Sequence, residues 1–252
     1  MTDLTIALRP RTSGDEQANF VHVTMEAYGG ELVITALTYN RELNEAVIVG
    51  LCSCVCASFA ETDQRFELFC DTLFSRPWLA RLPKLLTVER NVGHEHGQLA
   101  AMFLSRWPKT HCIKEKASSS DFGWWTSLYS MRESAHFLQE RLSTSKLCST
   151  DDFVYLIPSL ENEFIGAPTL KESFIRLRAL STLEEQCACF LSTYSQQTEA
   201  APPQTLECTV DTTADSKQRA NLDTAINLAL NLYVASKIEA RTLESFDYSV
   251  LA

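Results

Sequence analysis

Three consecutive segments near the start of the chain constrain its fold more than any other feature. Residues 20–26, 32–39 and 46–56 are rich in β-branched and aromatic side chains, and Gly29 and Gly30 separate the first two. Such segments between turn residues predict β-strands. Connections this short allow only antiparallel neighbours, because a parallel pair needs a long crossover. The sequence therefore predicts an antiparallel three-stranded meander.

A helix, a strand and a second helix are expected after the meander. Residues 59–74 carry apolar side chains at helical spacing, and residues 85–88 are a short apolar run between Pro83 and Gly93 that ends in Glu89. Residues 95–107 again follow a helical pattern. This order predicts a ribonuclease-H-like α/β fold, a mixed sheet flanked by helices on both faces.

The second half gives weaker signals. We expect mostly helix over 121–147, a helix over 169–180, and a hairpin of residues 187–194 and 205–212. A last helix over 221–237 would be capped by Asn221 or Asp223.

These expectations divide the chain into one domain and two flanking segments. We expect a flexible N-terminal segment over 1–17, the ribonuclease-H-like domain over 18–240 with a helical insert at about 118–182, and a tail over 241–252.

Composition limits the classes of function. The net charge of −10 argues against a broad basic nucleic-acid surface, but it allows an acidic centre that metal ions bridge to phosphate. From the sequence we expect neither a membrane span nor a signal peptide. Nine cysteines, an odd number at positions typical of strands and helices, are interpreted as reduced thiols of an intracellular protein.

Three carboxylates form the candidate site. Glu26 ends the first strand, Glu89 ends the fourth, and Asp223 begins the last helix. In ribonuclease-H-like folds, carboxylates from such elements hold two divalent ions that hydrolyse a phosphodiester. Hard carboxylate oxygens suit Mg²⁺ or Mn²⁺. We therefore expect Glu26, Glu89 and Asp223 as metal ligands and catalytic residues.

Four short motifs resemble the C-terminal nuclease domain of the herpesvirus terminase large subunit, which packages and cuts viral DNA. Leu-Thr-Val-Glu-Arg-Asn at 86–91 is similar to an apolar run ending Val-Glu-Gly-Asn in that family. The segments 97–103, 47–51 and 223–229 resemble its following helix, its third strand and its closing Asp-Asp-Thr helix. The resemblance runs over about 20–238.

The resemblance implies an enzyme, its cofactors and its setting. It implies a metal-dependent endonuclease that cuts concatemeric double-stranded DNA with two Mg²⁺ or Mn²⁺ ions. It also implies other terminase subunits, including an ATPase part, and the portal as partners, no membrane, a possible oligomer, and the host cell nucleus as location. No phosphate-binding Gly-x-x-x-x-Gly-Lys-Ser/Thr loop is present, so the ATPase half is expected on a separate polypeptide or outside a fragment.

Departures from the family pattern concern the acids themselves. Met25 stands at the place of the family's first aspartate, Leu222 replaces one acid of the closing pair, and Arg90 replaces a glycine. A regular first strand would turn Met25 toward the site and Glu26 away from it, which weakens metal binding; a bulge would re-aim Glu26. The alternative function is a catalytically degenerate terminase-like subunit with an assembly role. A cellular ribonuclease-H-like binding module is a third possibility.

The remaining conspicuous residues have structural interpretations. Cysteines 52, 54 and 56, and likewise 187 and 189, are interpreted as buried small hydrophobic residues rather than zinc ligands. The His-Glu-His run at 94–96 is interpreted as the solvated start of a helix, or as assisting Glu89. Asn227 and Asn231 are interpreted as a solvated stripe, and the tryptophan pair at 124–125 as core or an inter-subunit surface.

Overall fold

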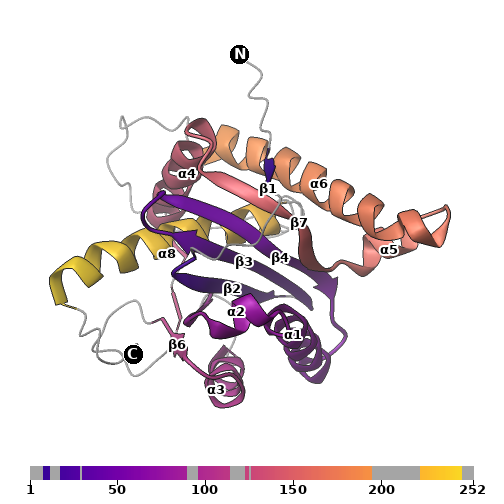
Figure 1. Ribbon diagram of the computed structural model, residues 1–252, viewed down its shortest axis with the longest axis horizontal. Helices are drawn as coiled ribbons and strands as arrows, with labels where there is room; N and C mark the ends of the chain where they lie inside the picture. Colours follow the sequence, from indigo (N-terminus) through magenta and orange to yellow (C-terminus); the bar gives the residue numbers. More distant parts are fainter. Residues whose placement is uncertain are drawn as a thin grey trace, which may run out of the picture.

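A computed structural model describes residues 8–11, 18–28, 30–89, 96–113, 123–124, 126–194 and 222–245. In these residues one sheet has the strand order β1-β7-β4-β3-β2-β5-β6 (Figure 1). Its strands are β1 (Arg9–Arg11), β2 (Phe20–Tyr28), β3 (Glu31–Asn40), β4 (Glu45–Val55), β5 (Lys84–Val88), β6 (Thr110–Cys112) and β7 (Leu147–Leu156). The helices are α1 (Phe59–Phe74), α2 (Pro77–Arg81), α3 (His96–Arg106), α4 (Leu128–Ser143), α5 (Pro158–Glu163), α6 (Lys171–Tyr194) and α8 (Asp223–Ser245), with a short 3₁₀ turn at Pro168–Leu170.

The predicted meander is confirmed. Strands β2, β3 and β4 pair antiparallel in sequence order. Strand β5 then joins β2 in parallel, and β7 joins β4 in parallel on the other side. The sheet is therefore mixed, as the sequence predicts.

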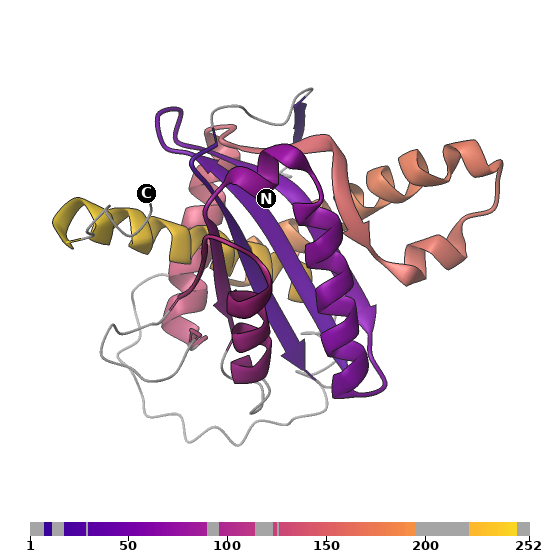
Figure 2. The same ribbon diagram turned by 60° about the horizontal axis from the view of Figure 1, so that its bottom comes forward.

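Helices cover both faces of this sheet. Helices α1, α2 and α3 lie on one face, and α4, α6 and α8 lie on the other (Figures 1 and 2). Each layer has its own core: Phe66 and Phe103 are fully buried in the first, and Leu138 and Phe190 in the second. The structure thus has the predicted fold class.

Helix α1 shows how local sequence positions a layer. The hydroxyl of Ser58 caps the helix by accepting from the backbone N–H of Glu61. Phe69, on its buried face, approaches Gly50 of β4 so closely that a Cβ there would lie 2.7 Å from the ring. Glycine therefore lets α1 pack directly on the central sheet.

The second half contains the largest departures from the sequence predictions. Residues 187–194, predicted as a strand, are the last turns of α6, and the predicted partner 205–212 lies outside the described residues. The expected helical region 121–147 contains α4, and β7, which begins at Leu147, was not foreseen. A strand of such mixed polarity is hidden from periodicity arguments, because Asp151 and Asp152 interrupt its apolar pattern.

Parts of the two flanking segments also form regular secondary structure. Within the predicted flexible segment 1–17, β1 pairs in parallel with β7, and buried Leu8 donates its N–H to Glu184 Oε1 at 2.8 Å. Helix α8 continues to Ser245, into the predicted tail. None of the described helices is both long and apolar enough to cross a membrane.

Candidate functional site

The register between β2 and β5 decides where the candidate carboxylates point. Met25 is paired with Val88, and the N–H of Glu89 donates to the carbonyl of Met25 at 2.9 Å. Both Met25 and Val88 are buried in the core under α1 and α3. Since successive side chains alternate between faces, Glu26 and Glu89 both point to the opposite face, toward α8.

This arrangement corrects the prediction for a regular first strand. The pairing of β2 with β3 and with β5 shows no register break, so β2 has no bulge. Yet Met25 points into the α1–α3 core and Glu26 faces α8 beside Glu89. Glu26, and not Met25, therefore shares a face of the sheet with Glu89.

The same face of β2 and β5 carries a buried polar seam, which we define as His22, Thr24, Glu26, Thr87 and Glu89. All five are at most 7 % exposed. The Nε2 atom of His22 lies 2.8 Å from the Thr87 hydroxyl. Such a run of polar residues on a central strand is costly unless partners satisfy it, so the overlying helix has to supply polar groups.

Helix α8 supplies two asparagines one turn apart. The Oδ1 of Asn227 accepts from the N–H and the hydroxyl of Thr35, at 3.0 and 2.8 Å. The Nδ2 of Asn231 donates to the carbonyls of His22 and Thr35, and its Oδ1 accepts from the Tyr39 hydroxyl at 2.9 Å. Both asparagines are at most 1 % exposed, so their interpretation as a solvated stripe was wrong.

Several polar atoms between α8 and the sheet remain without a hydrogen bond within the described residues. They are His22 Nδ1, Thr24 Oγ1, Glu89 Oε1 and Asn227 Nδ2. Burial lowers the pKa of His22 to about 3, although Asn231 partly opposes this shift, so the imidazole is neutral near pH 7. Two carboxylates, Glu26 and Glu89, are thus buried on the face that α8 covers, and Glu89 Oε1 has no hydrogen-bond partner among the described residues.

The third candidate ligand comes from the start of α8. Asp223 is the first residue of the helix and is half-buried, whereas Leu222 before it is buried in the core with α4 and α6. Among the described residues no three His, Cys, Asp or Glu side chains are grouped closely enough to hold a metal ion. The predicted approach of Asp223 to Glu89 therefore stays a prediction.

The other sequence interpretations have mixed outcomes. Cysteines 52, 54 and 56 are buried free thiols, as predicted, and Cys187 is too, but Cys189 is exposed. Trp124 belongs to the core and packs edge-on against Tyr233, with ring centroids 5.9 Å apart. Arg90, His94, Glu95, Trp125 and Asn221 lie outside the described residues, and of His96 only the backbone is described.

Sequence reasoning missed His22, Thr87, Asn227 and Asn231 as parts of this site. A signal was available for each, because His22, Thr24 and Glu26 alternate along one strand face, Thr87 and Glu89 do so on another strand, and Asn227 and Asn231 follow Asp223 at intervals of four. Polar residues that recur at the spacing of the buried face of a strand or helix are better interpreted first as part of a site and only then as surface residues.

Comparisons with known proteins bear on the fold. No protein-family model and no curated protein matches the chain. Among solved structures, the human cytomegalovirus terminase nuclease domain in a Mn-soaked, inhibitor-bound form is similar with a TM-score of 0.50 and 12% identity, covering 74% of this chain and 89% of that domain. The Mn-soaked form of the same domain gives 0.49 and 13%, covering 78% and 91%. The P22 large terminase nuclease domain gives 0.37 and 11%, covering 61% and 71%. The first of these comparisons shows that the chain has, in divergent form, the ribonuclease-H-like fold of a terminase nuclease domain.

Proposed function

We propose that this chain is the metal-dependent endonuclease domain of a terminase that packages viral DNA. One observation carries the proposal: in a terminase nuclease fold, Glu26 and Glu89 lie side by side on the face covered by α8, where neighbouring parallel strands end. Open α/β sheets place their sites at these strand ends.

The donor set fits a divalent ion of the hard class. Glu26 is 7 % and Glu89 2 % exposed, and Glu89 Oε1 has no hydrogen-bond partner in the described part of the chain. Two buried carboxylates in adjacent register repel each other unless a proton or a cation neutralises them. Carboxylate oxygens from neighbouring side chains are ligands that suit Mg²⁺ or Mn²⁺.

Each of the candidate residues would have its own role in hydrolysis. Glu26 and Glu89 would hold the ions, with Asp223 as the third carboxylate from α8. Bound divalent ions would lower the pKa of the attacking water and stabilise the leaving oxygen. Asn227 and Asn231 fix α8 on the sheet through Thr35, and this contact positions the start of the helix that carries Asp223.

The proposed setting follows the resemblance to terminases. The substrate would be concatemeric double-stranded DNA, and the partners would be the other terminase subunits, including an ATPase part, and the portal. The proposed location is the host cell nucleus. A degenerate subunit with an assembly role is the second candidate, favoured by the lack of a preformed three-ligand group among the described residues.

Nicking of a supercoiled plasmid separates these two candidates. The purified chain is expected to convert the plasmid to the open circle with Mn²⁺ and not with EDTA. Glu89→Gln should lower the rate at least 100-fold, because the variant loses a metal ligand. Glu42→Gln, at an exposed turn position, makes the same chemical change as a matched control and should leave the rate unchanged. Equal nicking by Glu89→Gln, or none by the wild type, would exclude this endonuclease mechanism.

A further inference from the structure

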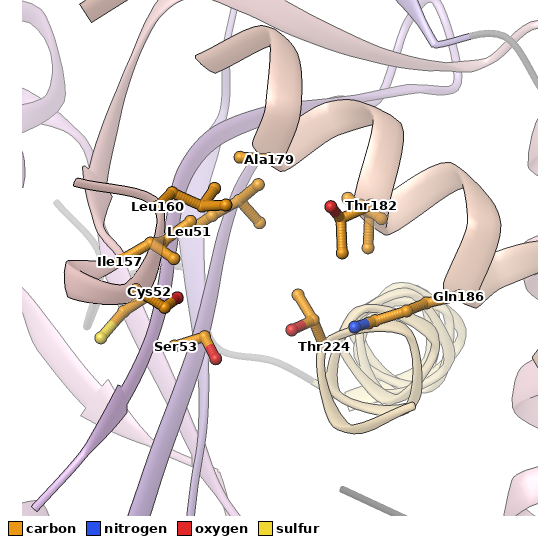
Figure 3. Close-up of a pocket in the computed structure, with 11 residues that line it drawn as sticks. Leu51, Cys52, Ser53, Ile157, Leu160, Ala179, Thr182, Gln186 and Thr224 are labelled. Atoms are coloured by element: carbon orange, nitrogen blue, oxygen red, sulfur yellow. The ribbon is translucent and has the colours of Figure 1, made fainter. Parts of the chain in front are cut away.

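A cavity of about 110 Å³ lies on the same face of the sheet, beside the first turn of α8 (Figure 3). It is partly open to solvent and is formed by the end of β4, by α5 and α6, and by Thr224. The lining residues are Leu51, Cys52, Ser53, Ile157, Ser159, Leu160, Ala179, Thr182, Leu183, Gln186 and Thr224. Cys52 contributes its backbone, since its sulfur points away from the open space (Figure 3).

The lining offers much unused hydrogen-bonding capacity. Four residues with hydroxyls and one with an amide line this space, namely Ser53, Ser159, Thr182, Thr224 and Gln186, of which Ser159 is exposed. None of the five side chains forms a hydrogen bond within the described part of the chain, and Gln186 Oε1 is buried without a partner. Buried polar atoms are normally satisfied, so the buried Gln186 Oε1 predicts a hydrogen-bond donor in the occupant, and the partly exposed hydroxyls of Ser53, Thr182 and Thr224 are available beside it.

The chemistry of the lining restricts that occupant. No Lys, Arg, Asp or Glu lines the cavity, which disfavours a phosphate and, because divalent ions need carboxylates, also a metal ion. Opposite Thr182, Thr224 and Gln186 stand apolar side chains from Leu51, Ile157 and Leu160 (Figure 3). The lining of the cavity therefore fits a neutral group that has an apolar face and several hydrogen-bonding atoms.

The size of the cavity points to one class of such groups. A water molecule needs roughly 10–15 Å³ of cavity volume measured in this way. A cavity of about 110 Å³ therefore holds the equivalent of about seven to eleven water molecules, that is, a group of about as many heavy atoms. That is the size of a pyrimidine or purine ring system. Enzymes that bind an extruded base recognise it by hydrogen bonds to its edge and by contact with apolar side chains on its face.

The sheet register places this cavity two strands away from Glu26. Glu26 is paired with Val33, and Val33 is paired with Ser53, all on one row of the sheet. Two strand spacings amount to about 10 Å, the span of a nucleotide or two. A base in the cavity would therefore leave a neighbouring phosphodiester near Glu26.

We propose that this cavity binds a nucleobase unstacked from the DNA strand close to the phosphodiester that is cut. This inference rests on the proposed endonuclease function, which it deepens by assigning the chain its own base-binding site. Thr182 and Gln186, one turn apart on α6, provide the hydroxyl and the amide that read the base edge.

Binding of free deoxynucleosides tests the cavity without requiring cleavage. Saturation-transfer NMR with the four deoxynucleosides should show binding to the wild type, and affinity should fall at least tenfold in Thr182→Val and in Gln186→Met, which keep the side-chain volume but remove hydrogen-bonding atoms. Glu185→Gln on the exposed side of α6 is the matched control and should bind as the wild type does. Absence of nucleoside binding by the wild type, or equal binding by both cavity variants, would overturn the proposal.

A second arm separates a base of the DNA strand from a free nucleoside. Single-stranded oligonucleotides with one abasic position, moved along the strand, should lose affinity at one register, and Thr182→Val should remove that dependence. Uniform affinity for all abasic positions would overturn the assignment to DNA. Glu89→Gln should lose nicking and keep nucleoside binding. A wild type that binds nucleosides but never nicks would therefore refute the endonuclease function and leave the cavity standing.

Discussion

His22 shows most clearly how a single residue is shaped by this fold. It is fully buried on β2, its Nε2 lies beside the hydroxyl of Thr87, and burial lowers its pKa to about 3. An unfolded histidine titrates near pH 6.5. Between about pH 3 and pH 6.5 the unfolded chain therefore binds a proton at His22 that the folded chain does not bind.

The pH dependence of stability follows from this difference. The contribution of His22 is constant above pH 6.5, and the free energy of unfolding should fall by about 1.4 kcal/mol per pH unit as pH decreases from 6.5 toward 3. His22→Gln removes this titration, so its stability curve between pH 6.5 and 4 should be shallower by one proton. Urea unfolding at several pH values measures both curves. Parallel curves for the two proteins would contradict the buried neutral state of His22.

At the scale of elements, α8 is held to the sheet by amides as well as by its apolar side chains. Asn231 contacts the backbone of both β2 and β3 and accepts from Tyr39, while Asn227 contacts Thr35. Deleting a buried amide leaves its partners unsatisfied, at about 1–3 kcal/mol for each such group. These contacts therefore fix the helix in its position over Glu26 and Glu89.

A double-mutant cycle measures one of these contacts. We expect Asn231→Ala to lower the free energy of unfolding by about 3 kcal/mol, because it loses three hydrogen bonds, and Tyr39→Phe by about 1 kcal/mol, because it loses the bond to Asn231. The effects should be less than additive, with a coupling of about 1 kcal/mol. Lys237→Ala, in the same helix and partly exposed, is the control. Strictly additive losses would show that the two side chains do not interact.

Predictability from sequence also differed between elements. The meander, α1, β5 and α3 were predicted because local periodicity and turn residues define them. Strand β7 was not predicted, because it is determined by its pairing with β4 and β1 rather than by local sequence. The full length of α6 was not predicted either, because its β-branched and cysteine residues are also typical of a strand. The facing direction of Glu26 depended on register with β5, which no local pattern encodes.

At the scale of the whole molecule, net charge dominates the expected behaviour toward DNA. A net charge of −10 leaves few clustered Lys and Arg side chains to release counterions from phosphates. Duplex binding by the isolated chain in EDTA should therefore be weak at physiological salt and should strengthen with divalent metal. Fluorescence anisotropy of a labelled duplex measures it. Tight binding in EDTA would contradict this expectation.

The central claim is that Glu26 and Glu89 form a metal-binding pair, and the most direct test is the melting temperature as a function of Mn²⁺ concentration. The wild type should melt several degrees higher at saturating Mn²⁺, since a ligand at 100 times its Kd stabilises by about 2.7 kcal/mol. Glu89→Gln should lose most of this rise and, without Mn²⁺, melt at the same temperature as the wild type or higher, because the repulsion with Glu26 is relieved. Glu42→Gln should behave as the wild type. A full Mn²⁺-induced rise in Glu89→Gln would contradict the account.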